Sequence, residues 1–296
     1  MPFLKTNSVH QVYYATYGNP KGEKFLFIHG GPGAGTSEQV LKFFDLERSL
    51  VVLVDQRGCG KSTPLAETSE NNTELLIEDF ENIRKLLGIE QWVLFGGSWG
   101  STLALTYAQN YPQVAKKLII RGIFLASQQG TDWLVKPNGA ARIMPLAWAN
   151  LNDKIPELKQ QSNPCKYLYE RIEQGDNEAA FAFATWEAEI SCLHPNKDLI
   201  KAMGSFPLGL SIGKIELYYM LNNFFIEEGQ ILAHADKLSM PIEIVHGQYD
   251  IVCPLDDALK LKNAVAHANL HIMPNSGHSA NEPEISEKLT ELAANF

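Results

Sequence analysis

Cysteine is scarce in this chain, and positive charge is in deficit. Only four cysteines occur among 296 residues, and no two of them are spaced as C-x-x-C. Because a disulfide framework or a zinc site needs clustered cysteines, the sequence predicts free thiols and no metal site. Lys and Arg number 25 against 34 Asp and Glu, which gives a formal net charge of −9. A nucleic-acid surface needs clustered cations, so we expect no nucleic-acid partner.

Long apolar runs are also lacking. No stretch approaches the ~18 to 20 residues that span a bilayer, and residues 1–8 contain no hydrophobic core of a signal peptide. We therefore expect no membrane association and a cytoplasmic location. The composition leaves the oligomeric state open.

What the chain does have is a regular alternation of short apolar runs with longer helical patterns. This alternation predicts an α/β fold with βαβ units and a mostly parallel central sheet. Before Gly88, four apolar residues at helical spacing predict a helix with one apolar stripe: Leu76, Phe80, Ile83 and Leu87. The predicted strands are Phe25–Ile28, Val51–Val54, Trp92–Phe95, Leu118–Ile120, Ile242–Val245 and Asn269–Met273.

The strand pattern is interrupted in the middle of the chain. After about Leu125 and until about Met240, the strand runs vanish, and Trp, Tyr, Ala and charged residues recur at helical spacing. We interpret residues 126–240 as an inserted helical cap (lid) domain. Residues 1–125 and 241–296 then form one discontinuous core domain.

Gly96-Gly97-Ser98-Trp99-Gly100 matches G-x-S-x-G and lies between a predicted strand and a predicted helix. This context is typical of a nucleophile elbow, in which a sharp turn strains the serine and the glycines let strand and helix approach closely. The alternative is a glycine-rich turn with a chance serine. The context favours Ser98 as a nucleophile.

A serine nucleophile needs a base and an orienting carboxylate, which follow it in the order Ser, Asp or Glu, His in this architecture. His278 lies in a polar loop directly after the last predicted strand, and Asp250 follows the strand that ends at Val245. Asp256 and Asp257 are competing carboxylates, but they open a helix, where acidic residues are common for capping reasons. We predict a triad of Ser98, His278 and Asp250.

A glycine-rich loop, His29-Gly30-Gly31-Pro32-Gly33, follows the first of the predicted strands. Its backbone N–H groups predict an oxyanion hole, with the N–H of Trp99 as the other donor and Gly31 as the donor from the loop. Two nucleotide-binding patterns fail here. The loop is not G-x-G-x-x-G, and Gly60-Lys61-Ser62 lacks the leading glycine of a P-loop, because that position is Asp55.

Taken together, these motifs resemble the proline iminopeptidases, α/β-hydrolases that release N-terminal proline. The similarity runs over nearly the whole chain and rests on the glycine-rich loop, the long form of the elbow and three further segments: Asp55–Pro64, Arg121–Phe124 and Val245–Asp250. The resemblance implies an α/β-hydrolase fold, peptide substrates with a free N-terminus and no cofactor. It also implies that Glu187 and Glu216, in the cap, hold the amino end of the substrate. The segment after Glu216 departs from the family pattern, so N-terminal residues other than proline stay open as substrates.

Two other functions remain as alternatives. A cap-bearing carboxylesterase or amidase would keep the triad without recognising an amine. A non-catalytic binding protein on the same scaffold would require a degraded triad, whereas all three predicted positions are intact.

Overall fold

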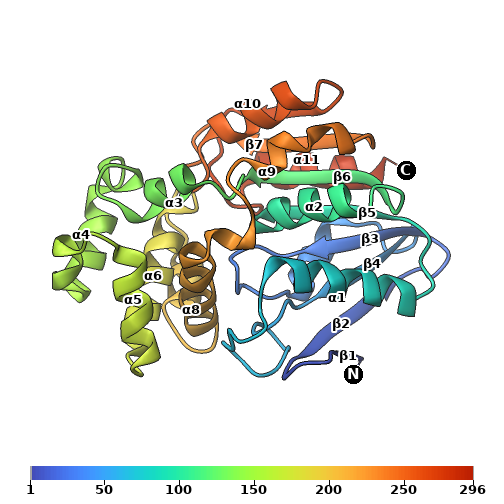
Figure 1. Cartoon of the computed structure of the whole chain (residues 1–296). Coiled ribbons are helices and arrows are strands. Elements are labelled where there is room, and N and C mark those ends of the chain that lie inside the picture. The colour runs from blue at the N-terminus through green and yellow to red at the C-terminus, as the bar shows by residue number, and fades with distance from the viewer. Residues whose placement is uncertain (1, 296) are drawn as a thin grey trace.

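The computed structural model of the chain, which describes residues 2–295, contains one eight-stranded sheet (Figure 1). The strand order is β1-β2-β4-β3-β5-β6-β7-β8; β2 pairs antiparallel with both β1 and β4, and all other pairs are parallel. This confirms the predicted α/β class. All six predicted strand segments lie in strands of this sheet: β3 (Glu23–Ile28), β4 (Ser49–Val54), β5 (Trp92–Ser98), β6 (Ala115–Ile123), β7 (Ile242–Gly247) and β8 (Asn269–Met273). The edge strand β1 (Phe3–Lys5) and its neighbour β2 (Gln11–Gly18) were not predicted.

Both faces of the sheet are covered by helices, because the central strands are apolar on both sides. One face packs against α1 (Thr73–Leu86), α2 (Trp99–Asn110) and α10 (Leu255–Ala264). The other face carries a phenylalanine-rich cluster under η1 (Glu38–Phe43) and α11 (Pro283–Ala294). The side chains of β3 alternate between these two clusters, as Leu26 and Phe25 illustrate. Parallel strands buried in this way read as continuous apolar runs.

Helix α1 forms where the apolar stripe predicted it. Asn72 caps its first turn by accepting a hydrogen bond from the N–H of Leu75 at 3.0 Å. Leu76, Phe80 and Ile83 are buried against the sheet. The chain leaves the helix at Gly88, whose φ of 64° suits a glycine.

Between β6 and β7 the chain is helical and contains no strand in its described residues. Figure 1 shows α3, α4, α5, α6 and α8 gathered at one end of the molecule, beside the sheet. Helices α6 and α8 pack against each other, and Trp186 of α6 donates a hydrogen bond from Nε1 to the carbonyl of Leu134 in α3 at 3.1 Å. The helices of this segment are α3 (Gln128–Val135), η2 (Ala140–Arg142), α4 (Pro145–Lys154), η3 (Pro156–Gln160), α5 (Pro164–Glu173), α6 (Asn177–Ile190), α7 (Lys197–Met203), α8 (Leu208–Leu221), η4 (Asn223–Phe225), α9 (Gln230–Ala233) and η5 (Ala235–Lys237).

In residues 2–295 we find no helix whose length and apolar character would let it cross a membrane.

Candidate active site

Ser98 lies at the sharp turn between β5 and α2. Its φ of 58° and ψ of −128° place a residue with a side chain in a region that normally favours glycine. The flanking glycines make this turn possible. A Cβ atom on Gly96 would lie 2.4 Å from the carbonyl oxygen of Gly100, and one on Gly100 would lie 2.2 Å from that of Ile28.

His278 and Asp250 meet in the loops after β8 and β7. Nδ1 of His278 lies 2.7 Å from Oδ2 of Asp250, and Oδ1 of Asp250 accepts the N–H of Cys253 at 2.8 Å. Burial alone would raise the pKa of Asp250. The charge of His278 and the hydrogen bond between His278 and Asp250 outweigh this effect, so the pKa of Asp250 is lowered overall. The ionised carboxylate therefore keeps the proton of the imidazole on Nδ1 and leaves Nε2 as an acceptor.

Arg121, on β6, occupies that acceptor. Its Nη1 lies 3.1 Å from Nε2 of His278 and donates a 2.9 Å hydrogen bond to the carbonyl oxygen of the same residue. In residues 2–295 no hydrogen bond joins Ser98 to His278. The structure thus brings His278 to Asp250 as predicted, but it aims the Nε2 atom at Arg121 and not at the serine.

Glycines make room for this arrangement of Arg121 and His278. Gly97 is paired with Arg121 across β5 and β6, and a Cβ atom on Gly97 would lie 2.2 Å from Nε of the arginine. A Cβ atom on Gly122 would lie 2.8 Å from Cε1 of His278. The conformation of the site therefore depends on missing side chains as much as on those present.

The glycine-rich loop after β3 packs directly on Ser98. A Cβ atom on Gly30 would lie 3.3 Å from Cβ of Ser98. In the described part of the chain, no protein acceptor binds the backbone N–H of Gly31 or of Trp99, the first residue of α2. Both groups thus remain available as the predicted oxyanion donors.

The two cap glutamates line the same small cavity as Ser98. This cavity of about 20 Å³ has Gly31 and Ser98 in its wall, together with Glu187 from α6 and Glu216 from α8. Burial raises the pKa of both carboxyl groups, most strongly that of Glu216, whose pKa the charge of Glu187 raises further. Oε2 of Glu216 is buried and has no hydrogen-bond partner among residues 2–295. The raised pKa values disfavour two negative charges in this cavity, and Oε2 of Glu216 is left to meet a ligand there.

Known proteins similar to this chain identify its family. Residues 24–284 match the model of the alpha/beta hydrolase fold family. The chain is 41% identical to the proline iminopeptidase of Arabidopsis thaliana, over 97% of this chain and 77% of that protein. It is 40% identical to the proline iminopeptidase of Xylella fastidiosa (strain Temecula1), over 99% of this chain and 95% of that protein. The chain belongs to the proline iminopeptidase family.

Solved structures with more distant sequences share the fold of this iminopeptidase-family chain. An esterase from Exiguobacterium antarcticum has a TM-score of 0.70 at 22% identity, covering 99% of this chain and 97% of its own. A thermophilic esterase from Thermogutta terrifontis has a TM-score of 0.70 at 18% identity, covering 99% and 96%. At these identities the likeness concerns the fold alone.

In this member of the proline iminopeptidase family, the sequence did not predict the role of Arg121, whereas His246 at its strand end was expected to be structural. His246 is fully buried; its Nδ1 accepts the N–H of Ile123 at 3.1 Å, and its Nε2 donates to the carbonyl of Cys253 at 2.8 Å. Burial lowers the pKa of His246, so it is a neutral support for the Asp250 loop. Arg121 opened one of the family motifs, which was the available signal, but no pattern predicted its contact with His278.

Proposed function

We propose that this protein is a serine exopeptidase that releases N-terminal proline from peptides. The observation that carries the proposal is the position of two buried carboxyl groups, Glu187 and Glu216, in the cavity of Ser98. An esterase has no need to keep two acidic groups out of water, because burying a charge is costly unless a partner compensates for it.

In the proposed reaction, Ser98 Oγ attacks the carbonyl carbon of the first residue while Nε2 of His278 takes the hydroxyl proton. Asp250 holds the imidazole in the required tautomer, and the N–H groups of Gly31 and Trp99 bind the oxyanion. His278 then returns its proton to the leaving amine, and the acyl-enzyme forms. Water, activated by His278 in the same way, releases proline and restores Ser98.

Before this first step, His278 has to exchange its partner. Its Nε2 atom faces Arg121 at 3.1 Å in the structure, and a base must lie within hydrogen-bond reach of the proton that it takes. We infer that substrate binding draws Nε2 from the guanidinium group towards Ser98.

The glutamate pair supplies the exopeptidase specificity in this proposal. The secondary ammonium group of an N-terminal proline donates two hydrogen bonds and carries one positive charge, which suits a pair of carboxyl groups in which two negative charges are disfavoured. The cavity lined by Ser98 and the two glutamates holds only about 20 Å³, so a residue that precedes the N-terminal one would find no space beside the carboxyl pair. An acylated nitrogen would lack the charge and would leave the carboxylate unpaired.

We also propose the division predicted from sequence, with residues 126–240 as the cap over a core of residues 1–125 and 241–296. The cap provides the glutamates and the core provides the nucleophile. A cytoplasmic location and peptide partners with a free N-terminus belong to the same proposal.

The variant Glu187→Gln/Glu216→Gln tests the role of the pair. It should lose turnover of prolyl anilides while keeping turnover of a small nitrophenyl ester, because Ser98 and its partners are unchanged. If the variant turned over each substrate as fast as the wild type does, the result would instead favour a cap-bearing carboxylesterase or amidase.

A further inference from the structure

We propose that Gln56 is a positioning residue that sets the geometry of the oxyanion hole by joining its two donors. The inference rests on the proposed hydrolase chemistry at Ser98, and it assigns a task to a sequence motif that this chemistry does not use. Gln56 is the second residue after β4 and is 3% exposed.

The side chain of Gln56 bridges the two segments that carry the oxyanion donors. Its Oε1 accepts a 2.9 Å hydrogen bond from Nε1 of Trp99, and its Nε2 donates one of 2.8 Å to the carbonyl oxygen of His29. An amide is suited to this place because it accepts at one atom and donates at the other. A carboxylate could only accept, and an apolar side chain could do neither.

The backbone of Gln56 continues the bridge towards Gly31. Its N–H donates a 3.0 Å hydrogen bond to Nε2 of His29, so the proton of this imidazole is on Nδ1. His29 Nδ1 then donates to the carbonyl oxygen of Gly30 at 2.9 Å. Because a trans peptide is planar, a fixed Gly30 carbonyl also fixes the N–H of Gly31 on the opposite side. Burial lowers the pKa of His29, which keeps the ring neutral for this relay.

Trp99, the other donor residue, depends on Gln56 for its only described side-chain hydrogen bond. Its ring is fully buried and packs between two cap residues, with ring centroids 5.2 Å from Tyr219 and 5.5 Å from Phe224. Without Gln56 the indole N–H would be buried and unpaired, a state that costs free energy and favours a shift of the ring. Because Trp99 is the first residue of α2, such a shift also moves its backbone N–H.

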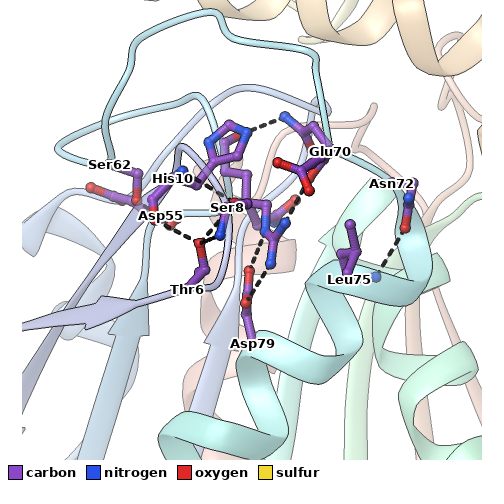
Figure 2. Close-up of polar contacts among 12 residues, drawn as sticks. Thr6, Ser8, His10, Asp55, Ser62, Glu70, Asn72, Leu75 and Asp79 are labelled. Atoms are coloured by element: carbon purple, nitrogen blue, oxygen red, sulfur yellow. Dashed lines mark hydrogen bonds and ion pairs between the residues drawn. The ribbon is translucent and has the colours of Figure 1, made fainter.

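Neighbours on both sides hold Gln56 in place. Asp55 accepts hydrogen bonds from the N–H and Oγ1 of Thr36, at 2.6 and 2.7 Å, and from the N–H of Lys61 at 2.7 Å. Arg57 binds Asp79 on α1 through Nε at 2.6 Å and Nη2 at 2.9 Å. Figure 2 shows Asp79 with these two bonds, and Asp55 bonded to Ser62 in the same loop. Because Asp55 and Arg57 are both held by hydrogen bonds, the backbone of Gln56 has little freedom. Its side chain can therefore hold Trp99 and His29 in fixed positions.

Oxyanion donors act only when they lie about 2.7 to 3.1 Å from the developing charge, and losing one donor costs about 10²- to 10³-fold in kcat. A misplaced donor affects the transition state more than the bound substrate. We therefore expect Gln56→Leu to lower kcat on a prolyl anilide by about 10²-fold while KM changes by less than about threefold.

Two ligands separate positioning from general damage. Affinity for a prolyl boronic acid, whose adduct with Ser98 is tetrahedral, should fall in parallel with kcat. Affinity for free proline, a ground-state ligand of the cavity, should stay within about threefold of wild type. The matched control is Gln109→Leu, which removes another buried glutamine that bonds the carbonyls of Ile231 and His234 from the far end of α2. It should lose stability without losing kcat.

Trp99→Phe probes the same hydrogen bond from its other side, and it remains informative if Gln56→Leu does not fold. If the bond positions the donors, the double variant Gln56→Leu/Trp99→Phe should have nearly the kcat of the worse single variant. Losses of kcat that multiply, an unchanged kcat in both single variants, or an equal fall in proline and boronate affinity would each overturn the proposal.

A nitrophenyl ester serves as second substrate. If wild type cleaves the ester but no prolyl anilide, the exopeptidase proposal fails while the role of Gln56 is still measured on the ester.

Discussion

Nη1 of Arg121 lies 3.1 Å from Nε2 of His278, the nitrogen that should face Ser98 during catalysis. The same Nη1 atom also donates to the carbonyl oxygen of His278 at 2.9 Å. A guanidinium group with no acidic partner within ion-pair distance in residues 2–295 thus holds both the ring and the backbone of the proposed base.

Arg121→Lys should lower kcat by about tenfold with little change in KM, because an ammonium group keeps the charge but cannot reproduce the planar donor geometry of arginine. Steady-state kinetics on a prolyl anilide measure the effect. Arg84→Lys, at an arginine paired with Glu81 on α1, is the control and should leave kcat unchanged. An unaltered kcat in Arg121→Lys would mean that the contact with His278 has no catalytic consequence.

Asp250→Asn should lower kcat by about 10⁴-fold, because an amide would stabilise the wrong imidazole tautomer. Asp257→Asn is the matched control: Asp257 is also buried and also follows β7, but it bonds Lys260 at 3.2 Å and makes no described hydrogen bond or ion pair with a histidine. Kinetics of both variants on the same anilide distinguish the two aspartates. Comparable losses in both would contradict the triad assignment.

Glu216→Gln should make the protein more stable at pH 8 but not at pH 4. Burial raises the pKa of Glu216 in the folded state above its value in the unfolded chain. The folded state then binds more protons above the unfolded pKa, so the stability linked to this group is present at low pH and is lost as pH rises. Glutamine does not titrate, so the variant does not lose this stability as the pH rises. Thermal melts of wild type and variant across this range should diverge by a few degrees towards alkaline pH, and parallel curves would contradict the buried, shifted state of this carboxyl group.

Gly96→Ala should destabilise the fold more than Gly88→Ala. A methyl group on Gly96 would lie 2.4 Å from a backbone oxygen of α2, whereas one on Gly88 meets nothing within 4 Å. Overpacking costs about 1 to 3 kcal/mol, occasionally more, and an alanine at the positive φ of Gly88 costs about 1 to 2 kcal/mol. Urea titration of both variants measures the difference, and equal losses would show that the elbow can relax.

Much of this molecule was predictable because its central strands are buried on both faces and read as continuous apolar runs. Phe25–Ile28 and Val51–Val54 are of this kind, and the elbow at Ser98 follows from the spacing of its glycines. Strand β2, which lies between β1 and β4, was missed, since only Val12–Ala15 of Gln11–Gly18 form a buried run and Val12 is its one β-branched residue.

The details of the site were less accessible from sequence. The contact between Arg121 and His278 depends on side-chain rotamers and on the space left by Gly97 and Gly122, which no periodic pattern records. The raised pKa values of Glu187 and Glu216 likewise arise only once two distant helices, α6 and α8, pack together. Sequence identified these residue types at these positions, and only the fold determines which atoms face each other.

The central claim is that Glu187 and Glu216 recognise a free N-terminal amine next to Ser98. Its most direct test is the ratio of kcat/KM for a prolyl anilide with a free nitrogen to that for its N-acetylated twin. We predict a ratio of at least about 10³ in wild type, which collapses towards unity in Glu187→Gln/Glu216→Gln. A wild-type ratio near one would contradict the claim.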